Sequence, residues 1–221
     1  TGKSLAYLLP AIFWSKHNGE KVVISTKTIN LQEQLIGKDI PFLNRKLGLD
    51  FRAELMIGRN NYLCRRKAKF AGGTPDFFGD EKYIAQVDAI LEWARKTERG
   101  VMSELSFVPT QDAWEEVACD GDNCQRIRCE FYGDCFFYRA RRAASQADVL
   151  VANHHLVMAD LAVRMESKNY TSALVLPPYQ RIIFDEAHSV ESVATEYFGL
   201  RLTRRSLARI LSRLIRSDRS S

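Results

Sequence analysis

The stretch that decides the fold is Arg181-Ile182-Ile183-Phe184-Asp185-Glu186-Ala187-His188. A basic residue precedes three apolar ones, a pattern that predicts a short buried strand of a parallel sheet. Asp185 and Glu186 come directly after that strand. A carboxylate at this position can hold Mg²⁺, and a second one beside it can polarise a water for attack on a γ-phosphate. Taken alone, an acidic pair after a strand is more often a solvated strand end.

A second motif stands at the other end of the chain. Thr1-Gly2-Lys3-Ser4 is the second half of the phosphate-binding loop pattern G-x-x-x-x-G-K-[ST]. In a complete loop, backbone N–H groups wrap the phosphates, the lysine reaches the β- and γ-phosphates, and the serine hydroxyl binds Mg²⁺. Half of the motif fits a Ser/Thr-rich helix start equally well. A strongly apolar helix follows at once, as a nucleotide-binding domain requires, and the chain starts without Met, so we expect a fragment.

Further along the chain, strands and helices alternate. Residues 21–26 form an apolar strand, and Thr26 or Thr28 can cap the helix that follows it. Asp148-Val149-Leu150-Val151-Ala152-Asn153 predicts a strand that returns to the same sheet, and a helix follows it. We therefore expect an α/β fold, with a parallel sheet covered by helices on both faces.

Composition narrows the range of possible functions. The chain has 221 residues, is 46% hydrophobic, and carries a net charge of +5 with a pI of about 9.0. It has no run of some 18 apolar residues and no signal peptide, so we expect neither a membrane span nor secretion. Arginine and lysine gather at 65–69, 139–142 and 201–219. Such clusters suit a nucleic-acid backbone, although any one of them is more often a solvated helix face.

The parallel-sheet rhythm stops between about residues 61 and 140, where all five cysteines lie: Cys64, Cys119, Cys124, Cys129 and Cys135. The last three are spaced Cys-x4-Cys-x5-Cys. Structural zinc sites usually pair cysteines two to four residues apart, whereas longer spacings with one distant member suit an iron–sulfur cube at least as well. The spacing therefore favours iron–sulfur modestly over zinc, in a small, mostly helical domain. Without a secretory signal, disulfides are not expected.

These segments together resemble the DinG branch of the XPD-like iron–sulfur helicases of superfamily 2. The Asp-Glu-Ala-His motif matches the family's motif II, and the resemblance also rests on Gly58–Cys64, Asn123–Arg141 and Ala152–Leu156. It implies a RecA-like motor domain in residues 1–60 and 141–190, an iron–sulfur insertion in 61–140, and the start of a helical arch in 191–221.

The resemblance also implies site residues. The 4Fe-4S ligands would be Cys64, Cys124, Cys129 and Cys135, with Cys119 a spare or a rival for one position. Thr1, Gly2, Lys3, Ser4 and Asp185 would bind MgATP, and Glu186 would activate the hydrolytic water. Ser25, Thr26 and Gln32 of motif Ia would contact DNA, and His188 would couple nucleotide state to DNA contacts.

The expected function is ATP-dependent, 5′ to 3′ unwinding of forked DNA from a single strand, with a role in DNA repair. We expect a monomer in the bacterial cytoplasm, and no activity from a fragment alone. Two alternatives stay open from the residues: a zinc-stapled nucleic-acid-binding module without unwinding activity, and an iron–sulfur electron carrier. The carrier leaves both nucleotide motifs unexplained, so it ranks last.

Overall fold

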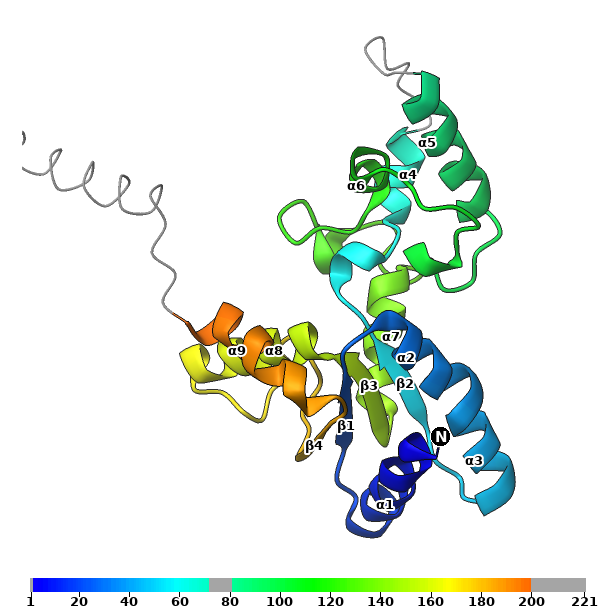
Figure 1. The fold of residues 1–221 in the computed structure, drawn as a ribbon. Helices are drawn as coiled ribbons and strands as arrows, with labels where there is room; N and C mark the ends of the chain where they lie inside the picture. Colours follow the sequence, from blue (N-terminus) through cyan, green and yellow to red (C-terminus); the bar gives the residue numbers. More distant parts are fainter. Residues whose placement is uncertain (1, 72–80, 200–221) are drawn as a thin grey trace, which may run out of the picture.

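The computed structural model describes residues 2–71 and 81–199. Their centre is a four-stranded sheet in the order β2-β3-β1-β4, in which every neighbouring pair is parallel (Figure 1). The strands are β1 (Val22–Thr26), β2 (Ala53–Met56), β3 (Val149–Asn153) and β4 (Arg181–Phe184). The predicted α/β fold with a parallel sheet is confirmed.

Strand β1 lies inside the sheet, and all five of its residues are buried. Its apolar β-branched residues suit this position, where both faces are covered. The register pairs Thr26 with Asn153 of β3, and Ser25 with Phe184 of β4. The carboxyl ends of these three strands therefore meet at one edge, where ligands bind in open parallel sheets.

Alternate residues of the strands face two separate cores, as the two-residue period of a strand requires. Val22 and Ile24 pack in the larger core with apolar residues of the helices α1 (Lys3–Asn18) and α3 (Ile40–Leu47). Val23 packs in the smaller core with residues that include Val157 of α8 (His154–Ser167). The sheet is thus covered on both faces.

The short helix α2 (Ile29–Gln34) continues through a π-helical turn at Leu35–Asp39 into α3. The hydroxyl of Thr28 accepts a hydrogen bond from the backbone N–H of Leu31 at 3.3 Å, so Thr28 is the N-cap of α2. Of the two caps that the sequence allows, the structure selects Thr28.

The cysteine-bearing segment is inserted between β2 and β3, and Figure 1 shows it beyond the end of the sheet. Its helices are α4 (Arg65–Ala71), α5 (Glu81–Ala94) and α6 (Gln111–Val117), and α7 (Phe136–Gln146) returns the chain to the sheet. Helix α6 contacts both α4 and α5. Antiparallel bridges join Tyr62 to Val101 and Leu63 to Ala118, which closes the base of the insertion.

After β4 the chain makes a 3₁₀ turn at Ala187–Ser189 and continues as α9 (Val190–Phe198), which packs against α8. Thr1 and the arginine-rich stretch predicted as part of a helical arch, 202–214, lie outside the described residues. In residues 2–71 and 81–199, no helix is long and apolar enough to cross a membrane.

Candidate functional site

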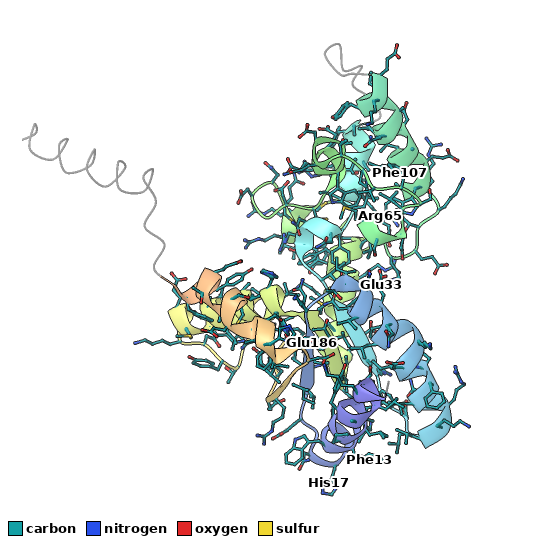
Figure 2. The ribbon with its side chains drawn as sticks, viewed as in Figure 1. Phe13, His17, Glu33, Arg65, Phe107 and Glu186 are labelled. Atoms are coloured by element: carbon teal, nitrogen blue, oxygen red, sulfur yellow. The ribbon has the colours of Figure 1, made fainter. Side chains whose placement is uncertain are left out.

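The two nucleotide motifs meet at the carboxyl edge of the sheet. Gly2 precedes α1 with a left-handed φ of 99°, a conformation that glycine adopts without strain, and Lys3 begins the helix. Asp185 and Glu186 follow β4. Figure 2 shows Glu186 at this edge, apart from Arg65 of the inserted segment.

Lys3 bridges both acidic side chains. Its Nζ lies 2.6 Å from Oδ1 of Asp185 and donates a hydrogen bond to Oε1 of Glu186 at 2.7 Å. These interactions raise the pKa of Lys3 above its ordinary value, the one to Asp185 more than the one to Glu186. The structure therefore brings together a lysine and two carboxylates that stand more than 180 residues apart in the sequence.

The carboxylates are ionised at neutral pH. Burial favours the neutral form of Asp185, but hydrogen bonds from Lys3 and from Tyr7 outweigh it and lower the pKa of Asp185. The hydrogen bond from Lys3 lowers the pKa of Glu186. Tyr7 Oη donates to Oδ2 of Asp185 at 3.1 Å, and burial followed by the Asp185 charge raises the pKa of Tyr7 to about 12. Sequence reasoning missed Tyr7; its one-turn spacing from Lys3 was the available signal.

Glu186 adopts an unusual backbone conformation. Its φ is 53° and its ψ 45°, the left-handed region that residues other than glycine rarely occupy. Such strain is often found at functional sites, where surrounding contacts hold it in place. Here the backbone N–H of Glu186 donates to Oδ1 of Asp185 at 2.9 Å, and the backbone N–H of Asp185 donates to the carbonyl of Ser25 at 2.8 Å.

All five cysteines line one small cavity of about 30 Å³ in the inserted segment. Cys64 lies at the start of α4, Cys119 follows α6, Cys124 and Cys129 stand on either side of the 3₁₀ turn Arg126–Arg128, and Cys135 is the N-cap of α7. All five are free thiols. Residues up to 71 positions apart thus contribute one set of sulfur atoms.

The thiols differ in their readiness to ionise. Hydrogen bonds lower the pKa of Cys64 to about 6, first from Cys119 and then from the N–H groups of Lys67 and Arg66. Cys135 also has a pKa of about 6, through Cys119 and the N–H groups of α7. The pKa of Cys119 is strongly raised, first by its contact with Cys135, then by its contact with Cys64 and by burial, all of which favour the neutral thiol. The carbonyl oxygen of Leu63, 3.4 Å from its Sγ, is an alternative acceptor for its one S–H proton.

The basic residues of the predicted cluster at 65–69 hold the cysteine-bearing loops together. Arg65 Nε donates to the carbonyl of Asp134 at 3.0 Å, and an Nη of Arg66 donates to the carbonyl of Asn123 at 2.8 Å. Lys67 Nζ lies 3.0 Å from Oδ2 of Asp120. These side chains therefore make contacts within the protein, and binding of this cluster to a nucleic-acid backbone stays a prediction.

Comparison with known proteins agrees with this arrangement. A family model described as DEAD_2 matches residues 105–207. The protein named ATP-dependent DNA helicase YoaA of Haemophilus influenzae is 35% identical over 94% of this chain, and its Escherichia coli counterpart is 36% identical over 94%. ATP-dependent helicase DinG of Mycobacterium tuberculosis (strain H37Rv) is 34% identical over 97%. The chain belongs to the DinG-type helicase family. It spans about a third of the length of these relatives, 31% for both YoaA proteins and 34% for DinG.

In this DinG-type chain, the residues predicted to contact DNA are buried. Ser25, Thr26 and Gln32 are each 0% exposed. Ser25 Oγ lies 2.6 Å from Nδ1 of His154, and both polar side-chain atoms of Gln32 lack a hydrogen-bond partner among residues 2–71 and 81–199. Their side chains therefore offer no open surface in this conformation, and the DNA contacts stay a prediction. Thr28, at the same turn, is exposed.

The remaining predicted residue of the DinG-type site, His188, lies close to the acidic pair. Its Nδ1 is 3.3 Å from Oε2 of Glu186, and its side chain is largely exposed. A histidine in contact with Glu186 can respond to movement of that carboxylate, so the geometry is compatible with the predicted coupling role.

Proposed function

We propose that this chain carries the nucleotide-binding part of an ATP-dependent DNA helicase, in which ATP hydrolysis drives movement along single-stranded DNA and duplex unwinding. The observation that carries the proposal is the contact of Lys3 with both Asp185 and Glu186 at the carboxyl edge of a parallel sheet. This combination of groups suits the phosphates and the metal ion of MgATP. The relatives are named ATP-dependent helicases, which supports the same activity.

Different residues of the chain would bind the phosphates, bind Mg²⁺ and activate water. Thr1, Gly2, Lys3 and Ser4 would hold the phosphates, with Lys3 leaving the carboxylates to meet the β- and γ-phosphates. Ser4 and Asp185 would bind Mg²⁺, which when bound neutralises the charge that develops on the phosphates. Glu186 would orient and deprotonate the attacking water, a role for which its low pKa keeps it ionised.

His188 would respond to ATP binding and hydrolysis through its contact with Glu186. When Lys3 moves to the phosphates, Glu186 loses a partner at 2.7 Å and keeps the one offered by His188 at 3.3 Å. A movement of Glu186 would thereby be transmitted to the 3₁₀ turn Ala187–Ser189, which precedes α9. We infer that this turn relays nucleotide state toward the DNA-binding surfaces.

We further propose that Cys64, Cys124, Cys129 and Cys135 hold a 4Fe-4S cluster. Support comes from the gathering of all five thiols around one cavity, and from the lowered pKa values of Cys64 and Cys135, because thiolates are the ligands of such clusters. The cluster would supply rigidity to a segment that has few regular elements between α6 and α7.

Zinc is the competing metal. In the described residues, no three Cys, His, Asp or Glu side chains are arranged to hold one metal ion. The ligands of an iron–sulfur cube bind different irons and stand further apart than those of a single zinc ion, so the two metal sites need different arrangements of sulfur atoms. Cys119 would then donate its single S–H proton to one ligand sulfur, although its position in the cavity keeps it a rival for one ligand position.

The insertion would meet DNA at its exposed 3₁₀ turn. Ile127 is 77% exposed between Arg126 and Arg128, so an apolar tip stands between two positive charges. Such a tip can pack against an unpaired base while the arginines bind phosphates. We propose that it separates the strands of forked DNA, with 5′ to 3′ movement, in a monomer that works in the bacterial cytoplasm and takes part in DNA repair.

Two measurements test these proposals. DNA-stimulated ATP hydrolysis and fork unwinding by the full-length protein test the motor; hydrolysis without any response to DNA would contradict it. Iron, acid-labile sulfide and zinc are measured on protein purified without oxygen. We expect four irons and four sulfides per chain, whereas one zinc without sulfide would favour the metal-stapled nucleic-acid-binding module.

A further inference from the structure

The phenol of Tyr7 touches the carboxylate on which the proposed nucleotide site depends. Tyr7 is four residues after Lys3 and three after Ser4, so the three side chains lie on the same side of α1. Its Oη donates to Oδ2 of Asp185 at 3.1 Å. The ring is half-buried and packs against the larger core, which fixes the position of the hydroxyl.

The two oxygens of Asp185 have different partners. Oδ1 lies 2.6 Å from Lys3 Nζ and accepts a hydrogen bond from the backbone N–H of Glu186 at 2.9 Å. Oδ2 accepts from Tyr7. The first partner is a mobile charge on an exposed side chain, whereas the second is a neutral hydroxyl on a ring held in the core.

When nucleotide binds, Asp185 would lose Lys3 as a partner and keep Tyr7. A lysine of the phosphate-binding loop moves toward the β- and γ-phosphates, which would release Oδ1 from Lys3. The hydroxyl of Tyr7 carries no charge at neutral pH, so the phosphates exert no comparable pull on it. Tyr7 would then be the side chain that keeps the carboxylate of Asp185 in a fixed rotation about its χ2 bond.

We propose that Tyr7 is a positioning residue for the metal-binding carboxylate of Asp185, and that it contributes to the affinity for MgATP rather than for ATP without metal. The inference rests on the proposed nucleotide site. A carboxylate held in place loses less rotational freedom when it binds a ligand, so preorganisation of this kind strengthens binding.

The test compares Tyr7→Phe with the unchanged full-length protein, because this substitution keeps the ring and removes only the hydroxyl. Equilibrium binding of ATP is measured in excess Mg²⁺ and again in EDTA. Loss of a hydrogen bond to a charged group predicts an increase of about tenfold in the Kd for MgATP, with little change in EDTA. The Mg²⁺ concentration for half-maximal ATP hydrolysis should rise by a similar factor, more than kcat falls at saturating Mg²⁺.

A matched control is Tyr170→Phe, which removes the same atom from a side chain that is 58% exposed. It should bind ATP like the unchanged protein in both conditions. If ATP binding is weakened equally with and without Mg²⁺ in Tyr7→Phe, the inference is overturned, and Tyr7 supports the structure of the phosphate-binding loop as a whole. Unchanged binding in both conditions would also overturn it. If the unchanged protein binds no MgATP, it is the proposed function that fails.

Discussion

Arg164 offers the sharpest test of how the acidic motif is held in place. On α8, its Nε lies 2.5 Å from Oδ2 of Asp160, and its Nη atoms donate to the carbonyls of Tyr170, Ser172, Leu176 and Pro177. Asp160 also accepts from the backbone N–H of Leu176 at 2.8 Å. One buried ion pair thus anchors the segment that leads into β4 and the acidic residues after it.

The cost of breaking this pair follows from its burial. The side chains of Arg164 and Asp160 are 3% and 0% exposed, so Arg164→Met would leave an uncompensated carboxylate inside the protein. Breaking a buried pair from one side costs about 3–5 kcal/mol. For a chain of this size, that loss corresponds to a decrease in Tm on the order of 10 °C.

The free energy of unfolding is measured by chemical denaturation of Arg164→Met beside Arg45→Met, a control at an exposed position of α3. The control should stay within about 0.5 kcal/mol of the unchanged protein. In Asp160→Leu/Arg164→Met the unpaired charge is gone, so the double variant should be more stable than Arg164→Met. A loss below about 1 kcal/mol in Arg164→Met would refute the reasoning, because the segment would then be anchored by other contacts.

Three further predictions concern the nucleotide site, the cysteines and the contact between Glu20 and Trp14. Lys3→Ala in the full-length protein should abolish ATP hydrolysis while DNA binding persists, and ATP turnover in that variant would contradict the phosphate-loop assignment. Cys129→Ser should lose iron and unwinding but keep some ATP hydrolysis; Cys119→Ser should keep four irons, and loss of its iron would make Cys119 a ligand. Glu20 accepts from the indole N–H of Trp14 at 2.7 Å, and this hydrogen bond, followed by that of Arg181, lowers its pKa. The contact should stabilise the fold above the ordinary glutamate pKa, and this stabilisation should be lost as the pH falls through the lowered pKa of Glu20. Tryptophan fluorescence should therefore change in that acid range. A Glu20→Gln variant with the same fluorescence titration curve would contradict this.

Three of the four strands were predictable because each has a strong local pattern, although β4 lies at an edge of the sheet and is half-buried rather than buried as predicted. The apolar runs at 21–26, 148–153 and 181–184 correspond to β1, β3 and β4, with small differences at their ends. Strand β2 was not predicted. Its sequence Ala53-Glu54-Leu55-Met56 is short and carries a half-buried glutamate whose pKa is raised by burial. This segment is a strand because it pairs with β3 at the edge of the sheet, and such a partner is invisible in a local window.

The basic residues around the cysteines show a second limit of prediction from sequence. The sequence shows that Arg65, Arg66 and Lys67 follow Cys64, but a run of cations suits phosphate, solvent and backbone carbonyls alike. Their acceptors include carbonyls at Asp134, Asn123 and Glu115, which lie 48–69 residues further along the chain. Only the folded loop brings those acceptors within reach.

The sequence by itself determined the parallel α/β class, the two nucleotide motifs and the cysteine spacing, because each depends on residue types within a few positions of one another. The tertiary structure decided which of these residues meet. Strand β4 lies beside β1, and this sheet order brings Asp185 to Lys3 and Tyr7; the closure of the insertion brings Cys119 into the same cavity as the other four thiols. Sheet order and loop closure depend on the burial of whole faces, which no local pattern specifies.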